Sequence, residues 1–176
     1  MLPLRSITMA VVLVGAACAD APTKPVTPPP PDGQAISAFV SVDNLHALPG
    51  QTVRVSVQVR AADAVKVGSY TGRLRFDPAM LVYKSEVAIN DGLRIANPSG
   101  AATGEIRFAG ANATGFTSTT IYSAQFTVKG GDWTRSLTLQ MEELSAARSL
   151  VNLSAQVQVA RVIYADGQIP VVQPKP

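Results

Sequence analysis

The sequence predicts an all-β domain, an antiparallel β-sandwich, and three observations lead to this fold class. From Ile36 onward the apolar residues recur with a period of two, which is the period of a half-buried strand. The apolar runs are short, and Gly, Pro and Asn separate them. Apolar residues make up 47% of the chain and charged residues 15%, which is enough apolar material for a packed core. About eight or nine short strands at roughly even spacing are typical of a sandwich.

The clearest strand is TVRVSVQVR at 52–60, where four valines alternate with arginine, serine and glutamine. Residues 88–103 predict a loop with a short strand at 93–96, and residues 142–148 predict a single helical turn. The other expected strands are AISAFVSVD (35–43), VGSYTGRLRF (67–76), MLVYKSEVAI (80–89), GEIRFAGA (104–111), TIYSAQFTVK (120–129), SLTLQMEEL (136–144) and a long final strand, VNLSAQVQVARVIY (151–164).

The N-terminal residues 1–17 have the features of an export signal. Arg5 is followed by an apolar stretch of about 11 residues, whereas a membrane span needs roughly 20. Small residues lead directly into Cys18, the only cysteine, and this arrangement resembles the lipobox of bacterial lipoproteins, in which the cysteine is acylated. Gly15 stands where that family prefers leucine, so cleavage to a secreted form is the alternative. We expect an exported protein anchored by lipid to the cell envelope, at the outer membrane if the cell has one.

Residues 18–35 combine the lipid-attachment cysteine with a proline-rich linker that has no apolar periodicity. At ~3.1 Å per residue such a linker reaches roughly 50 Å, which suits a stalk between an anchor and a domain. The predicted organisation is therefore a signal (1–17), a linker (18–35), a sandwich (36–166) and a C-terminal tail (167–176).

Composition and motifs argue against several classes of function. The formal charge of +3 is small and the basic residues do not cluster, so nucleic acid is not an expected partner. One His and one Cys exclude a disulfide framework and a Cys/His zinc site within the chain. Asp77, before a proline, is expected to cap a turn. Glu142 and Glu143, adjacent on a strand, are expected to point to opposite faces and so to form no catalytic pair. We expect no enzyme.

No cofactor is expected either. The stretch NDG at 90–92 carries amide and carboxylate oxygens, but no calcium-loop spacing follows it, so a plain turn is the simpler interpretation. Calcium held by loop carbonyls is the alternative. His46, alone in a turn, is expected to be a solvated surface residue.

One series of motifs resembles the cohesin domain family. The segment GSYTGRLRFDPAMLVY (68–83) is similar to that family's signature, in which a strand of alternating apolar residues runs into an aromatic-Asp-Pro turn. Further similar motifs follow in the family's order: ALPGQTVRVSVQV (47–59), GEIRFAGAN (104–112), IYSAQFTVKGG (121–131) and SLTLQMEELSAA (136–147). The resemblance implies a nine-stranded jelly roll, shared with some carbohydrate-binding modules. It also implies a non-catalytic module that binds a dockerin-type partner, often on polysaccharide-degrading enzymes.

The resemblance further implies a flat docking face made by the third, fifth, sixth and eighth strands. The side chains expected on that face as partner-binding residues are Arg73, Arg75, Arg94, Glu105, Arg107, Gln140 and Glu142. Arginine is enriched at protein interfaces because its planar fork binds carboxylates through two hydrogen bonds. The alternative is an ordinary solvated face of an antiparallel sheet.

Two other functions remain open from the sequence. Direct carbohydrate binding needs exposed aromatic rings; Tyr70 and Tyr122 fall on core faces, while Trp133 follows Gly130-Gly131-Asp132 in a turn and is expected to be partly exposed, as a possible sugar contact. The alternative for Trp133 is a lid packed over one end of the sandwich. A structural envelope lipoprotein without a soluble ligand is the third function.

Overall fold

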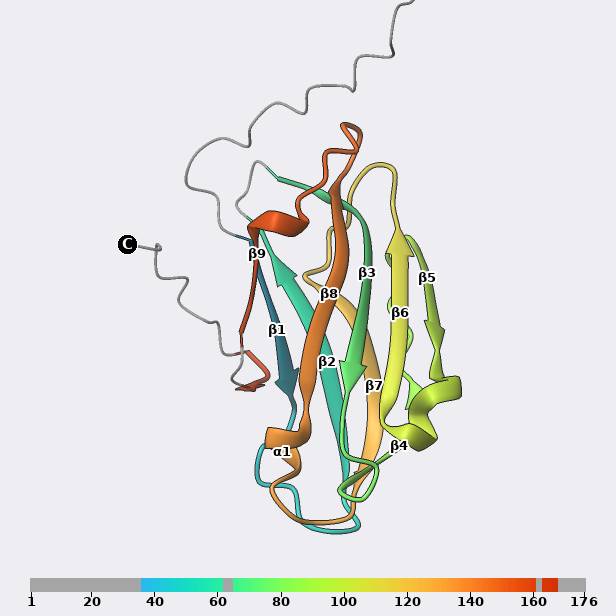
Figure 1. Ribbon diagram of the computed structural model, residues 1–176, viewed down its shortest axis with the longest axis vertical. Coiled ribbons are helices and arrows are strands. Elements are labelled where there is room, and N and C mark those ends of the chain that lie inside the picture. Colours follow the sequence, from blue (N-terminus) through green and yellow to red (C-terminus); the bar gives the residue numbers. More distant parts are fainter. Residues whose placement is uncertain (1–35, 62–64, 161–162, 168–176) are drawn as a thin grey trace, which may run out of the picture.

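Two β-sheets pack face to face in the computed structural model, which describes residues 36–61, 65–160 and 163–167 (Figure 1). One sheet has six strands and the other has four. The chain crosses between the layers several times, so neighbouring strands in space are often distant in sequence. This is the predicted β-sandwich, with ten strands in the described residues, the last only two residues long.

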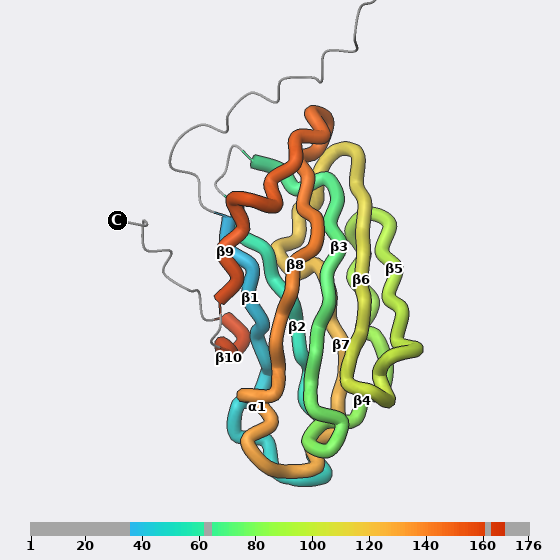
Figure 2. Tube along the Cα trace, viewed as in Figure 1, coloured from blue at the N-terminus to red at the C-terminus, as the bar shows by residue number. Residues whose placement is uncertain are grey.

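The six-stranded sheet has the order β10-β1-β2-β7-β4, with β9 also paired to β1. Both β9 and β10 run parallel to β1, one after the other along it, as Figure 2 shows. The strands are β1 (Ile36–Val42), β2 (Thr52–Arg60), β4 (Leu81–Glu86), β7 (Thr120–Val128), β9 (Val157–Val159) and β10 (Tyr164–Ala165).

The four-stranded sheet has the order β5-β6-β3-β8, and all of its pairings are antiparallel. Its strands are β3 (Val67–Arg75), β5 (Leu93–Asn97), β6 (Glu105–Ala111) and β8 (Thr138–Ala146). These are the strands that the family resemblance assigns to the docking face. The short strand predicted at 93–96 is therefore confirmed as β5.

The core lies between the two sheets and consists of the side chains that point inward, mostly every second residue along a strand. Val53, Val55, Val57 and Val59 of β2 are all buried, as the period of two predicts. The rings of Tyr70 (β3) and Phe108 (β6) come from the opposite sheet, and that of Tyr122 comes from β7, the neighbour of β2. Tyr70 and Tyr122 are almost fully buried, which confirms that they are core residues. The Phe108 and Tyr122 rings stack 5.0 Å apart, centroid to centroid, across the two sheets.

Three short helical elements connect the strands. The 3₁₀ helix η1 (Pro98–Thr103) joins β5 to β6, α1 (Trp133–Ser136) precedes β8, and η2 (Ser154–Gln156) precedes β9. The η1 helix ends at Gly104, whose φ of 82° is left-handed. A side chain there would also lie 2.1 Å from the Phe76 carbonyl oxygen, so this turn requires glycine.

Two expectations about the C-terminal part were wrong. Residues 142–148 contain no helical turn, because β8 continues to Ala146. Residues 151–164 do not form one long strand: an isolated bridge at Asn152, η2, β9 and β10 share this stretch. The residues that alternate in this stretch therefore form two short strands, β9 and β10, and each of them pairs with β1.

Candidate functional site: the outer face of the four-stranded sheet

The outward side chains of the four-stranded sheet form a regular grid, because the register pairs residues directly across the strands. Four rows cross the sheet, and consecutive rows are two residues apart along β5, β6 and β3, about 7 Å. The same spacing holds along β8 except between Glu143 and Gln140, which are three residues apart. In the order β5, β6, β3, β8, the rows are Leu93-Ala111-Ser69-Ser145, then Ile95-Ala109-Thr71-Glu143, then Asn97-Arg107-Arg73-Gln140, and last Glu105-Arg75-Thr138 on three strands.

The last two rows carry a network of ion pairs around Glu105. Its carboxylate accepts hydrogen bonds from Arg75 Nε at 3.0 Å and from Arg107 Nε at 3.1 Å. Arg73 lies 3.5 Å from the same carboxylate and also donates to Glu142. Three guanidinium groups thus share two carboxylates, and this part of the face has a net charge of +1. The hydrogen bonds from Arg107 and Arg75 hold the pKa of Glu105 below its usual value.

The first two rows carry small and apolar side chains. Leu93 and Ile95 of β5 are 65% and 62% exposed, although both are large aliphatic residues. The small residues of β6 and β3 next to them leave a hollow of about 210 Å³, with Glu143 on the β8 side. Exposed apolar residues beside a hollow are typical of binding surfaces.

A β-bulge in β8 places both glutamates on this face. Gly72 pairs with Met141 and Thr71 with Glu143, so Glu142 is an extra residue in the strand. Glu142 binds Arg73, and Glu143 borders the hollow. The expectation that these two side chains point to opposite faces was wrong, because the bulge interrupts the alternation.

Arg94 does not lie on the outer face, and the expected orientation of this residue was wrong. Its side chain is 9% exposed and points inward from β5. Arg94 Nε donates to the Asp91 carbonyl oxygen and Nη1 to the Thr120 carbonyl oxygen, both at 2.8 Å. Its guanidinium lies 4.9 Å above the Phe116 ring centroid. On a strand of alternating orientation, the outward positions belong to Leu93 and Ile95 instead.

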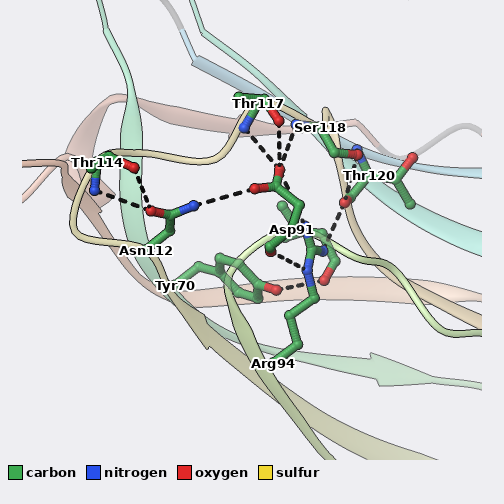
Figure 3. A network of polar contacts seen from close by, with 9 residues as sticks. Tyr70, Asp91, Arg94, Asn112, Thr114, Thr117, Ser118 and Thr120 are labelled. Carbon is green, nitrogen blue, oxygen red and sulfur yellow. Dashed lines mark hydrogen bonds and ion pairs between the residues drawn. The ribbon is translucent and has the colours of Figure 1, made fainter.

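Asp91 connects Arg94 to the loop between β6 and β7, as Figure 3 shows. One carboxylate oxygen accepts the backbone N–H groups of Thr117 and Ser118, at 2.8 and 2.7 Å, and the other accepts Asn112 Nδ2 at 3.2 Å. Burial alone would raise the pKa of Asp91, but these hydrogen bonds and the Arg94 charge hold it below its usual value. The carboxylate oxygens of Asp91 in the NDG stretch are thus occupied by donors from the protein, which favours the plain turn.

The buried hydroxyl of Tyr70 belongs to the same region, since it donates to the Ile121 carbonyl oxygen at 2.6 Å. Burial raises the pKa of Tyr70 to about 12. A phenol held neutral in this way supports the strand pairing and offers no acid or base near pH 7.

Trp133 is buried, at 4% exposure, so the expectation of a partly exposed ring was wrong. It lies in α1, which covers the lower end of the sandwich in Figure 1, and its side chain joins the core. In the part of the chain that the structure describes, no aromatic residue is among the exposed large apolar side chains. A buried ring cannot stack on a sugar.

Other predicted features can be placed or lie outside the described residues. Asp77 caps its turn, accepting the Ala79 backbone N–H at 2.8 Å. Residues 36–61, 65–160 and 163–167 contain no group of three or more His, Cys, Asp or Glu side chains that could hold a metal ion. No helix in these ranges is long and apolar enough to cross a membrane. Cys18, the linker and the end of the tail lie outside them.

Sequence reasoning missed the apolar part of the face. Leu93 and Ile95 were placed in a loop or a short strand of unknown facing, and Arg94 was given the outward position between them. The signal was present in the sequence, because LRI alternates, but alternation does not tell which side of a strand faces the core.

Comparison with solved structures shows the same fold in cohesins. A type I cohesin from Clostridium thermocellum, solved in complex with a dockerin, superimposes with a TM-score of 0.56 at 12% identity, over 76% of this chain and 96% of that one. The sixth cohesin of Acetivibrio cellulolyticus scaffoldin B, in complex with a mutant dockerin, superimposes with a TM-score of 0.54 at 17% identity, over 74% of this chain and 99% of that one. A non-cellulosomal cohesin from Archaeoglobus fulgidus superimposes with a TM-score of 0.51 at 21% identity, over 73% of this chain and 88% of that one.

Comparison with curated proteins gave no match. The family model of the cohesin domain matches residues 38–169, which include both sheets and the whole outer face described above. Since this match spans most of the chain and the fold agrees with it, the chain belongs to the cohesin domain family.

Proposed function

We propose that this chain is a non-catalytic interaction module that binds a dockerin-type protein through the outer face of the four-stranded sheet. The observation that carries the proposal is the exposure of Leu93 and Ile95 beside the arginine network on one flat face. Interfaces combine a desolvated apolar centre with arginine and a polar rim, and this face offers both. Family membership supports the proposal, as do the solved cohesins that carry a dockerin.

Binding to a panel of purified dockerin modules tests the proposal with the full-length chain. We expect at least one module to bind the wild type and to lose binding to Ile95→Asp, which places a charge among the apolar residues of the face. Leu48→Asp is the matched control, because Leu48 is 64% exposed but lies between β1 and β2 of the other sheet. No binding by any dockerin, or equal binding by Ile95→Asp, would refute the proposal.

The second part of the proposal is the location. The chain is exported and tethered to the envelope through an acylated Cys18, with residues 19–35 as the stalk, so that the outer face is presented to partners linked to polysaccharide degradation. The sequence of residues 1–35 supports this part, since a short apolar segment leads into a cysteine. Cys18→Ala should move the protein from the membrane fraction to the soluble fraction and abolish incorporation of labelled palmitate. Retention of this variant in membranes would rule out the anchor.

A further inference from the structure

We infer that the docking partner is bipartite: it presents carboxylates to Arg75 and Arg107 and, roughly 7 to 21 Å away along the strands, an aliphatic side chain to the hollow beside Leu93 and Ile95. This inference rests on the proposed function and specifies the chemistry of the partner. It also implies that the partner binds in one direction along the strands, because the charged rows and the apolar rows lie at opposite ends of the face.

The arginine network has unused donors that point to a carboxylate ligand. Arg73 is 24% exposed and already pairs with two carboxylates. Arg75 and Arg107 are 52% and 58% exposed, and each donates one hydrogen bond, from Nε, to Glu105. Within the described residues their terminal nitrogens have no hydrogen-bond partner. Because a guanidinium carries five N–H donors in a planar fork, both retain an edge that matches a carboxylate.

The hollow has the size and lining of a site for one side chain. Its volume of about 210 Å³ lies below the ~300 to 1,000 Å³ of typical small-molecule pockets. Ala109 and Ala111 of β6, Ser69 and Thr71 of β3, and Leu93 and Ile95 of β5 are among the residues that line it. An aliphatic side chain placed there would cover two exposed large apolar residues, which is the main gain in free energy available on this face.

Glu143 fixes the direction of binding. Its carboxylate borders the hollow on the β8 side, across the sheet from Ile95. A partner docked in reverse would bring its acidic residues to Glu143 and its aliphatic side chain to the arginines. Like charges would then meet, and an apolar group would cover hydrated guanidinium groups, both of which are unfavourable.

Selection from two display libraries tests the inference with the full-length chain. One library is a dockerin module with its surface positions randomised, and the other is an unrelated three-helix scaffold randomised in the same way. Each is selected against the wild type, against Arg75→Glu/Arg107→Glu, and against Ala109→Phe, which fills the hollow. Arg135→Glu is the control, because Arg135 is 88% exposed and lies in α1, outside the face. Thermal unfolding first establishes that each variant is folded.

We expect binders of the wild type to be enriched in Asp and Glu at one end of the contact and in Leu, Ile, Val or Met at the other. Their affinity should fall on the order of tenfold to a hundredfold for the double arginine variant and about tenfold for Ala109→Phe, and should change less than about twofold for Arg135→Glu. Selection against Arg75→Glu/Arg107→Glu should yield Lys and Arg at the positions that were acidic.

The two libraries separate this inference from the proposed function. Dockerin binders that need Ile95 but lack the acidic and aliphatic pattern would overturn the inference and leave the proposed function intact. Patterned binders from the three-helix library alone would support the inference and count against a dockerin partner. Recovery of no binder to the face from either library would overturn both.

Discussion

Asp91–Arg94 and Asp132–Arg135 are two ion pairs of the same residue types at the same i,i+3 spacing, and they lie in opposite environments. The Asp91 and Arg94 side chains are 12% and 9% exposed, and both take part in further hydrogen bonds. The Asp132 and Arg135 side chains are 55% and 88% exposed and sit in a turn at the end of the sandwich. The exposed pair has the shorter contact, at 2.9 Å against 3.7 Å.

The contrast teaches that burial, and not the contact distance, decides what such a pair contributes. An exposed pair contributes about 0 to 1 kcal/mol, because water solvates each partner nearly as well. Removing one partner of a buried pair costs about 3 to 5 kcal/mol, because the other charge is left without compensation. Asp91 and Arg94 therefore hold the start of β5 and the β6–β7 loop together, and through them the apolar end of the outer face.

The largest effect is expected for Asp91→Asn. The substitution leaves Arg94 charged and almost buried, and places an amide where several donors converge, so the free energy of unfolding should fall by about 3 kcal/mol. Urea denaturation of the full-length chain measures this change. A loss below about 1 kcal/mol would mean that the pair behaves like an exposed one and would break the comparison.

The contribution of the Asp91 carboxylate to stability should also depend on pH. Because the pKa of Asp91 is lowered in the folded state, its contribution is complete above the unfolded value, near pH 4, and is lost as the pH falls through the lowered folded value. The difference in stability between wild type and Asp91→Asn should therefore be constant from pH 5 to 8 and shrink below about pH 4. A difference in stability that grows on acidification would contradict a lowered pKa for Asp91 in the folded state.

Neighbouring residues of β6 extend the comparison, since Gly110 faces the core and Ala109 faces solvent. A methyl group on Gly110 would lie 2.4 Å from the Tyr70 hydroxyl, which is fixed by its bond to Ile121. Gly110→Ala should cost about 1 to 3 kcal/mol, as overpacking does. Ala109→Leu, one residue away on the outer side, should change stability by less than about 0.5 kcal/mol. The melting temperatures of the two variants check this prediction. Equal shifts in melting temperature would show that Gly110 and Ala109 do not face the core and the solvent as assigned.

A smaller effect is expected for Glu105→Gln in the exposed network. It removes a carboxylate shared by three arginines, but water can replace the lost contacts, so stability should fall much less than for Asp91→Asn. Any loss should diminish in 0.5 M salt, because exposed ion pairs are screened. A loss that is independent of salt and as large as that of Asp91→Asn would show that this network contributes as the buried Asp91–Arg94 pair does.

The smallest effect is expected for Asp132→Asn. The substitution removes the exposed ion pair while keeping the shape of the side chain, so the free energy of unfolding should change by about 0.5 kcal/mol or less. Measured beside Asp91→Asn under the same conditions, it is the direct control for burial. Similar losses for the two variants would refute the role assigned to burial.

Much of the fold and part of the face follow from local patterns that any strand must obey. The valines of β2, the inward position of Tyr70 and Leu74, and the outward position of Arg73 and Arg75 all follow from alternation within an amphipathic strand. Alternation failed at β8, where the bulge at Glu142 adds a residue. In β5 the side chains do alternate, but the charged Arg94 turns inward and the two aliphatic residues beside it turn outward.

The sequence by itself therefore determined the β-sandwich, the order of its strands along the chain and the family, because these depend on local periodicity and on motifs in a fixed order. Only the tertiary structure decided which arginines are exposed on the outer face and where the apolar hollow lies. The physical reason is that Arg94 finds carbonyl oxygens, a carboxylate and an aromatic ring inside the fold, supplied by segments 3 to 26 residues away. These partners compensate the cost of burying its charge, and they leave Leu93 and Ile95 to face the solvent.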